Sequence, residues 1–165
     1  GQDVGRLSSD QLAALRNREI GFVFQGFNLL PKLSSLDNVA LPLMYAGMGR
    51  DARRRQAQAM LDRVGLGERS HHTPLQLSGG QQQRVAIARA LATRPRIIFA
   101  DEPTGNLDSE TSRQVMDLFS QFNRDEGITL VLVTHETDMA AYARRRIRFH
   151  DGRVVEDVVT EAAAA

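Results

Sequence analysis

The chain has 165 residues, of which 42% are apolar, and carries 21 basic and 20 acidic side chains for a formal net charge of +1. This length suits one globular domain, which buries roughly two thirds of the surface of its unfolded chain and needs no disulfide or metal to hold its core. The absence of cysteine excludes a disulfide scaffold and a cysteine-ligated metal site. The near-neutral charge argues against a dedicated nucleic-acid binder, which usually has a strong basic excess.

The longest mostly apolar stretch, Val39 to Met48, is too short for a bilayer span, which needs about 20 residues. The sequence begins with Gly1 and shows no leader of charged and then apolar residues, so it predicts no signal peptide. We therefore expect a soluble chain whose first residue lies inside a longer reading frame.

Three short apolar runs predict buried strands, at residues 20–24, 97–100 and 128–133. Helical patterns separate them, and this alternation is typical of a parallel sheet covered on both faces by helices, an α/β architecture. A further run at residues 146–155 contains Asp151-Gly152 and predicts a hairpin at the edge of the sheet.

The interval between the first two predicted strands has a different hydrophobic pattern from the strands themselves. About seventy residues, beginning near Pro31, are rich in helical periodicity and predict an inserted helical lobe. We therefore expect residues 1–30 and 85–165 to form one core, and residues 31–84 to form a helical subdomain.

Polar side chains follow each predicted strand. Gln25 follows the first, Asp101 and Glu102 follow the second, and Thr134 and His135 follow the third. Ligands of a parallel sheet collect beyond the carboxyl ends of its strands, where Asp101 is well placed to hold Mg²⁺ and Glu102 to activate a water. An Asp-Glu pair alone is more often a cap or turn, and a lone histidine is usually structural. It is the joint pattern that indicates an active site.

Residues 77–81 read Leu-Ser-Gly-Gly-Gln and precede a helical pattern. Ser78 is expected to be the N-cap, with Gln81 reaching back to complete a capping box, while Gly79 and Gly80 leave the first amides uncovered. Such a helix start can receive an anion. Considered alone, the segment favours the simpler interpretation of a flexible turn that starts a helix.

Together these residues resemble the ATP-binding subunit of an ABC transporter over nearly the whole chain. Gln25 is similar to the glutamine of the Q-loop, residues 77–81 to the LSGGQ signature, residues 97–102 to the Walker B strand, residues 105–108 to the D-loop, and His135 to the switch histidine. Five motifs in the order of the family are far more specific than any single match. The resemblance implies the fold of a P-loop NTPase of the ABC type.

Longer runs indicate a subgroup of that family. Residues 24–31, 38–42 and 100–108 are similar to ATPases of the macrolide-exporter and lipoprotein-releasing type. The same branch contains peptide-export and cell-division members, so the resemblance does not identify a transported substrate.

The resemblance also implies a role for each motif residue. Asp101 and Gln25 would hold Mg²⁺, Glu102 would polarise the attacking water, and His135 would contact the γ-phosphate of ATP. Asp108 would couple the two sites of a dimer. These roles suit phosphoryl transfer, which depends on positioning and charge stabilisation.

The partners follow from the resemblance as well. Ser78, Gly79, Gly80 and Gln81 would bind the γ-phosphate of ATP held by a second subunit, so turnover would need a head-to-tail homodimer. The segment 29–46 would form much of the surface that meets an integral membrane permease. We therefore expect ATP and Mg²⁺ as ligands, no nucleic acid, and a cytoplasmic location on the inner face of the cell membrane.

The sequence departs from the family at the phosphate-binding loop G-x-x-x-x-G-K-[ST], which is absent. Lys32 is the only lysine and Gly26 lies six residues before it, but Pro31 and Leu33 occupy the second glycine and the Ser/Thr positions. The family places this loop upstream of Gln25, within a strand and helix of the same core. We therefore expect an N-terminal truncation that leaves apolar edges in need of cover, and no tight ATP binding or hydrolysis by the chain alone.

Two other functions remain open. One is a non-transport ABC ATPase that acts on nucleic acid, although residues 25–77 leave no room for a long coiled coil or zinc insertion, and the net charge offers no basic surface. The other is a degenerate ATPase that acts only as a binding module. Retention of Asp101, Glu102 and His135 argues against it.

Overall fold

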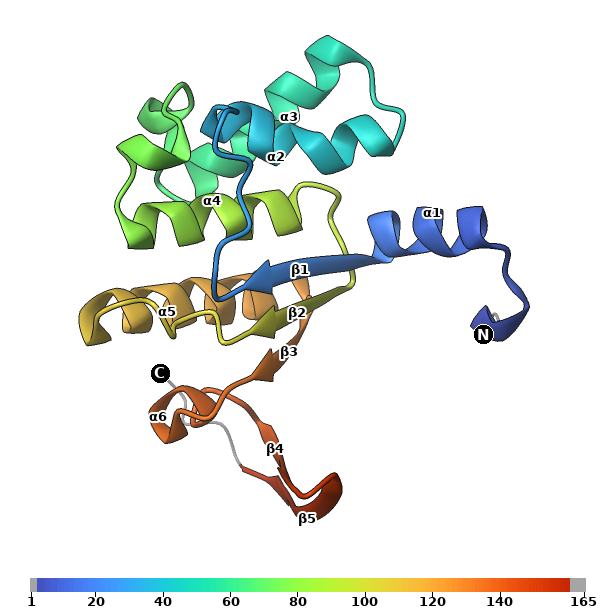
Figure 1. Ribbon diagram of the computed structural model, residues 1–165, viewed down its shortest axis with the longest axis vertical. Helices are drawn as coiled ribbons and strands as arrows, with labels where there is room; N and C mark the ends of the chain where they lie inside the picture. Colours follow the sequence, from blue (N-terminus) through green and yellow to red (C-terminus); the bar gives the residue numbers. More distant parts are fainter. Residues whose placement is uncertain (1–2, 161–165) are drawn as a thin grey trace.

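The computed structural model describes residues 3–160. Within them, a three-stranded parallel sheet has the order β1-β2-β3, and β4 and β5 form an antiparallel hairpin (Figure 1). The strands are β1 (Ile20–Phe24), β2 (Ile97–Asp101), β3 (Thr129–Val133), β4 (Arg145–His150) and β5 (Arg153–Val159). The α-helices are α1 (Ser9–Glu19), α2 (Ser35–Tyr45), α3 (Arg50–Arg63), α4 (Gly79–Leu91), α5 (Ser109–Glu126) and α6 (Thr137–Ala140). Short 3₁₀ turns are η1 (Val4–Arg6), η2 (Gly67–Arg69) and η3 (Pro74–Gln76).

The register of the sheet brings the three strand ends together. Phe24, Asp101 and Val133 are neighbours across β1, β2 and β3. The residues that follow each strand therefore start from one edge. The predicted α/β class with a parallel sheet is confirmed.

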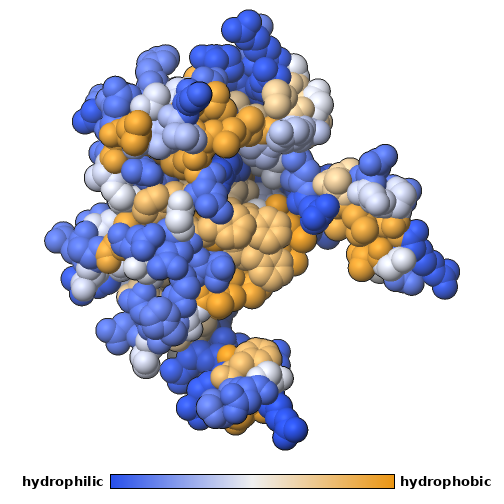
Figure 2. All heavy atoms as spheres, in the orientation of Figure 1, coloured by the Kyte–Doolittle hydropathy of each residue, from blue (hydrophilic) through white to orange (hydrophobic). Residues whose placement is uncertain are grey.

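Helices cover one face of this sheet in the part of the chain that the structure describes. On that face Val23 and Ile98 are 0% and 1% exposed. On the other face the stacked rings of Phe22 and Phe99 are 41% and 36% exposed, and Val131 beside them is 39% exposed. Figure 2 shows an apolar patch in the middle of the molecule, where Figure 1 draws the strands.

The expectation of a sheet covered on both faces is therefore wrong for residues 3–160. The reason is the handedness of the connections. Crossovers between parallel strands are almost always right-handed, and the strands follow one another across the sheet in chain order. Both α4 and α5 consequently lie on the same face.

Close contact between α4 and β1 depends on Gly21. A Cβ atom there would lie 2.6 Å from the carbonyl oxygen of Ala90. The missing side chain lets the last turn of α4 lie directly on the start of β1.

The segment between β1 and β2 is helical, as expected, and α2 packs against both α3 and α4. The buried amide of Asn38 closes the loop before α2 by donating to the carbonyls of Leu30, Leu33 and Ser34. One cluster of buried apolar side chains runs from this segment into the sheet. The division into a core and a helical subdomain stays a prediction.

The predicted hairpin is present, with positive φ at Asp151 (46°) and Gly152 (72°). It forms a sheet of its own, however, and does not extend the edge of the parallel sheet, so that expectation is corrected. No helix among the described residues has the length and apolar character for a bilayer span.

Candidate functional site

Glu102 and His135 meet at the carboxyl edge of the sheet. Glu102 Oε1 accepts a hydrogen bond from the main-chain N–H of His135 at 3.1 Å and lies 2.6 Å from Nδ1 of the same residue. Glu102 Oε2 accepts from the Thr134 hydroxyl at 3.2 Å. A carboxylate has about four acceptor positions, so these described contacts leave roughly one for a water. The sequence also places Thr134 at this edge but does not indicate a role for it.

The backbone holds Glu102 in an unusual conformation, with φ of 45°. Such a conformation costs a non-glycine residue about 1–3 kcal/mol and persists where the surroundings impose it. Here the Glu102 N–H donates to the carbonyl of Val133 at 2.8 Å, and the Gly105 N–H donates to the carbonyl of Glu102 at 3.1 Å. The turn after β2 is thereby tied to the end of β3.

The electrostatics of this pair follow from its geometry. The hydrogen bond and the negative charge of Glu102 raise the pKa of His135 above its ordinary value. The His135 side chain is 81% exposed, whereas that of Glu102 is 19% exposed. An exposed imidazole therefore sits over a largely covered carboxylate.

Gln25 follows β1 directly and is paired with Asn106 in the turn after β2. Gln25 Nε2 donates to Asn106 Oδ1 at 3.3 Å, and Asn106 Nδ2 donates to the Gln25 carbonyl at 3.0 Å. The sequence gives no direct indication of Asn106, because asparagine is an ordinary turn residue. The indication in the sequence was that Asn106 lies within residues 105–108, the segment that is similar to the D-loop.

The start of α4 has the predicted capping box. Ser78 Oγ accepts from the Gln81 N–H at 3.3 Å, and Gln81 Oε1 accepts from the Ser78 N–H at 3.0 Å. In these bonds the Ser78 oxygen only accepts, so its own proton remains available to an anion. Gly80 lies against α5, since a Cβ atom there would be 2.5 Å from Thr111 Cγ2, while one at Gly79 would have ordinary contacts.

Asp108 is the N-cap of α5. Its carboxylate accepts from the N–H groups of Glu110 and Thr111 at 3.1 and 2.9 Å and from the Thr111 hydroxyl at 2.7 Å. The bonds from Thr111 lower the pKa of Asp108 most. The visible role of Asp108 is to begin this helix, which packs against α4.

Two side chains of α4 that sequence reasoning missed connect it to this edge. Gln83 is fully buried and donates to the carbonyl of Pro103 at 2.6 Å. Arg89 donates to the carbonyls of Phe27 and Asn28 at 3.0 and 2.5 Å, and burial lowers its pKa. Their signal in the sequence was a polar residue within an otherwise apolar helical stripe.

The oxygen atoms at this edge of the sheet suit a hard cation that is also bound by a ligand such as a phosphate. Asp101 supplies a carboxylate and Gln25 an amide oxygen, and Phe24, which precedes Gln25, is the register neighbour of Asp101. Among the described residues, no group of three or more His, Asp or Glu side chains could hold a metal by itself. Mg²⁺ commonly takes one or two protein oxygens, waters and phosphate oxygens, so this sparse set fits it.

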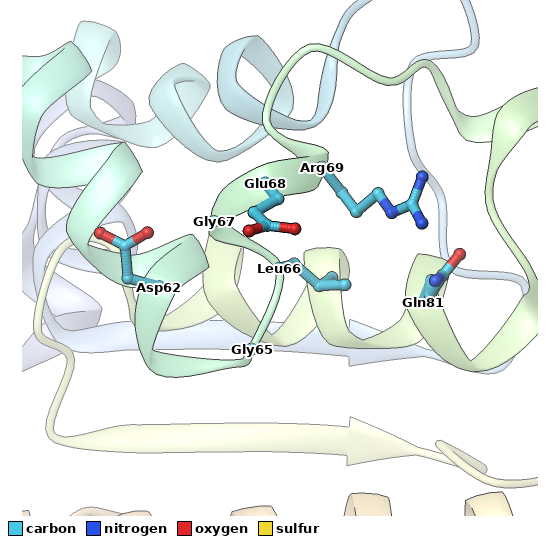
Figure 3. Close-up of a pocket in the computed structure, with 7 residues that line it drawn as sticks. All are labelled: Asp62, Gly65, Leu66, Gly67, Glu68, Arg69 and Gln81. Atoms are coloured by element: carbon cyan, nitrogen blue, oxygen red, sulfur yellow. The ribbon is translucent and has the colours of Figure 1, made fainter.

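A pocket of 360 Å³ lies beside the start of α4, away from Glu102 and His135. Its lining includes Glu68, Arg69 and Gln81. In Figure 3 the Arg69 and Gln81 side chains lie on one side of the pocket, and Asp62 lies on the other. The pocket therefore borders the helix start and takes no part in the sheet edge.

Comparison with known proteins gives several strong matches. The chain is 58% identical over 154 residues to a macrolide export ATP-binding/permease protein MacB of Syntrophobacter fumaroxidans, covering 92% of the chain and 22% of that protein. It is 53% identical over 154 residues to an uncharacterized ABC transporter ATP-binding protein of Thermotoga maritima, covering 93% of the chain and 65% of that protein. The chain thus spans about a quarter of the length of the MacB relatives.

Solved structures show the same fold. The ATP-binding cassette MJ0796, solved as a dimer in a post-hydrolysis state bound to ADP and Pi, matches with a TM-score of 0.83 and 45% identity over 94% of the chain and 69% of that cassette. The family model described as ABC transporter matches residues 1–105. On this evidence the chain belongs to the ABC transporter family and forms part of a MacB-type ATP-binding domain.

Proposed function

We propose that the chain is the signature-bearing and catalytic part of an ATP-hydrolysing ABC cassette, which in the complete protein drives an export or lipoprotein-release permease. The observation that carries the proposal is the Glu102 carboxylate, held by Thr134 and His135 at the sheet edge beside Asp101. That arrangement suits a general base aimed at a water.

In this proposal each residue at the edge has a distinct task. Glu102 accepts a proton from the attacking water through its remaining acceptor position. His135 donates from its imidazole to the transferred phosphate, and the exposure of its side chain leaves it free to turn toward a ligand. Asp101 and Gln25 would hold Mg²⁺, which would neutralise the phosphate charge.

The signature residues act on a second copy of the chain. Ser78, Gly79, Gly80 and Gln81 form a helix start with an available hydroxyl proton and a positive helix dipole, which suits a phosphate supplied from outside the chain. The dimeric state of MJ0796 supports this arrangement. Asp108, which begins the adjoining α5, would transmit the state of one site to the other.

The permease is proposed to contact the segment 29–46. Leu30, Met44 and Tyr45 are 48%, 43% and 75% exposed, so this segment offers apolar side chains at the surface. Through that contact the cassette would lie on the inner face of the cell membrane.

Replacing Glu102 tests the proposal in the complete protein. Glu102→Gln keeps the size of the side chain but removes the base, so we expect kcat for ATP hydrolysis to fall by about 100-fold or more while ATP binding persists. The matched control is Glu156→Gln, which changes an exposed carboxylate paired with Arg148 on the hairpin.

Turnover by Glu102→Gln within about threefold of the wild type would contradict a general-base role. ATP binding without hydrolysis by the wild type would instead favour the non-hydrolysing binding module.

A further inference from the structure

The turn after β2 lies very close to Gln25. A Cβ atom on Gly105 would lie 2.6 Å from Gln25 Nε2 and 3.1 Å from Gln25 Cδ, so a side chain there would push the glutamine aside. The next residue, Asn106, forms the two hydrogen bonds with Gln25 at 3.3 and 3.0 Å. Together they tie the end of β1 to the turn that follows β2.

These two hydrogen bonds determine how the side-chain amides of Gln25 and Asn106 are oriented, that is, where the oxygen and the NH₂ group of each amide lie. The Gln25 main-chain carbonyl can only accept, so the Asn106 atom that faces it is Nδ2. Asn106 Oδ1 then faces the Gln25 side chain, and because that oxygen also only accepts, Gln25 presents Nε2 to it. Gln25 Oε1 is left without a hydrogen bond to residues 3–160.

The free atom is the one that a hard cation requires. Mg²⁺ binds carboxylate, carbonyl and amide oxygens. An amide NH₂ group is a hydrogen-bond donor and cannot act as a ligand to the cation. An unrestrained glutamine can present either end of its amide. A side chain held with its oxygen free avoids the cost of ordering it when the cation binds.

We propose that Asn106 is a positioning residue for Gln25, and that it keeps the amide oxygen of Gln25 free for the cation of the nucleotide site. This inference rests on the proposed function, which supplies that cation. Gly105 belongs to the same device, because it makes room for the paired amides.

The test measures Mn²⁺ binding in place of Mg²⁺, by electron paramagnetic resonance of the complete protein with ADP, so that no turnover is needed. We expect Asn106→Ala to weaken Mn²⁺ binding about fivefold, in the range of one net hydrogen bond. Gly105→Ala, which displaces Gln25 while keeping Asn106, is expected to weaken it to a similar degree.

A double-mutant cycle separates positioning from general damage. In a Gln25→Ala background, Asn106→Ala should weaken Mn²⁺ binding by less than about twofold, because the residue it acts through is gone. The matched control is Asn17→Ala, which removes a similar amide bond, to the Pro42 carbonyl at 3.1 Å, and should leave Mn²⁺ binding unchanged.

Two results would overturn the inference alone: wild-type Mn²⁺ affinity in Asn106→Ala, or an equal loss in the presence and absence of Gln25. If the complete wild-type protein bound neither ADP nor Mn²⁺, the proposed function would fail and the inference with it. The two failures are therefore distinguishable.

Discussion

Glu102 and His135 form a contact in which the two partners differ greatly in exposure. The carboxylate is covered and fixed by the strained turn after β2, whereas the imidazole lies in solvent and reaches back to it. The contact therefore depends on the charge of His135, since a protonated imidazole is attracted to the carboxylate and a neutral one offers only a hydrogen bond.

The contact between Glu102 and His135 is expected to depend on pH. The pKa of His135 is raised in the folded chain, above the unfolded value of about 6.5. The stability that the pair contributes is therefore fully present below the unfolded pKa and is lost as pH rises through the folded pKa. Histidine NMR should show that Glu102→Gln lowers the titration midpoint of His135, whereas Glu156→Gln leaves it in place. An unchanged midpoint in Glu102→Gln would refute the pairing.

At the scale of elements, α4 connects most parts of the site. Its first turn carries the capping box, Gln83 holds the turn after Glu102, and Arg89 holds the loop after Gln25. A displacement of this one helix would therefore move several groups of the site together.

Arg89 gives a prediction for this connection. It bonds two carbonyls of consecutive residues, Phe27 and Asn28, whose φ values of 60° and 49° are strained. Lysine cannot reproduce the planar fork, so Arg89→Lys should lower the free energy of unfolding by about 1–2 kcal/mol in urea titrations and also weaken Mn²⁺ binding at Gln25.

The matched control is Arg84→Lys on the same helix. Arg84 bonds the carbonyl of Val64 and the side chain of Gln114, away from the loop after Gln25. It should lose a comparable amount of stability with no effect on Mn²⁺. Equal effects of the two substitutions on Mn²⁺ would argue against a specific link through Arg89.

The packing of α4 on β1 gives another prediction. Gly21→Ala would place a methyl group 2.6 Å from the Ala90 carbonyl oxygen, so the helix and strand must separate. We expect a loss of about 1–3 kcal/mol in the free energy of unfolding, as for overpacking in a core. Gly49→Ala is the control without a clash, because no atom lies within 4 Å of the added Cβ, and it should cost less, up to about 1 kcal/mol for a poorer N-cap of α3. Equal unfolding midpoints for Gly21→Ala and Gly49→Ala would contradict the close contact between Gly21 and Ala90.

At the scale of the whole molecule, the uncovered face of the sheet is the dominant feature. Phe22, Phe99 and Val131 form a continuous apolar surface on it, and Val133 at the end of β3 is 55% exposed. Large exposed apolar patches favour association, and an unpaired strand edge adds to that tendency.

We therefore expect the 165-residue chain by itself to self-associate. Because this chain lacks the phosphate-binding loop G-x-x-x-x-G-K-[ST], we also expect it to show no ATPase activity. Size-exclusion chromatography and dye binding should detect the association, and Phe22→Ser with Phe99→Ser should reduce it. Leu75→Ser is the control, because Leu75 is 89% exposed but lies outside this face, in η3. A monomeric wild-type chain, or magnesium-dependent turnover by it, would contradict the expectation.

The sequence alone determined the features that depend on neighbours in the chain. The apolar runs 20–24 and 97–100 predicted their strands, Ser78 and Gln81 predicted the capping box, and Asp151-Gly152 predicted the hairpin turn. Hydrophobic periodicity, capping and turn preference act over a few residues, so a single sequence carries them.

Only the tertiary structure decided the contacts between distant segments. Asn106 lies 81 residues from Gln25, and Arg89 lies 61 residues from Asn28, so no local pattern could indicate that either pair would meet. The uncovered sheet face was equally hard to predict, because the strands are apolar on both sides and so gave no indication that one face would lack a helix. Those outcomes depend on the direction in which successive crossovers place their helices, which is a property of the assembled sheet.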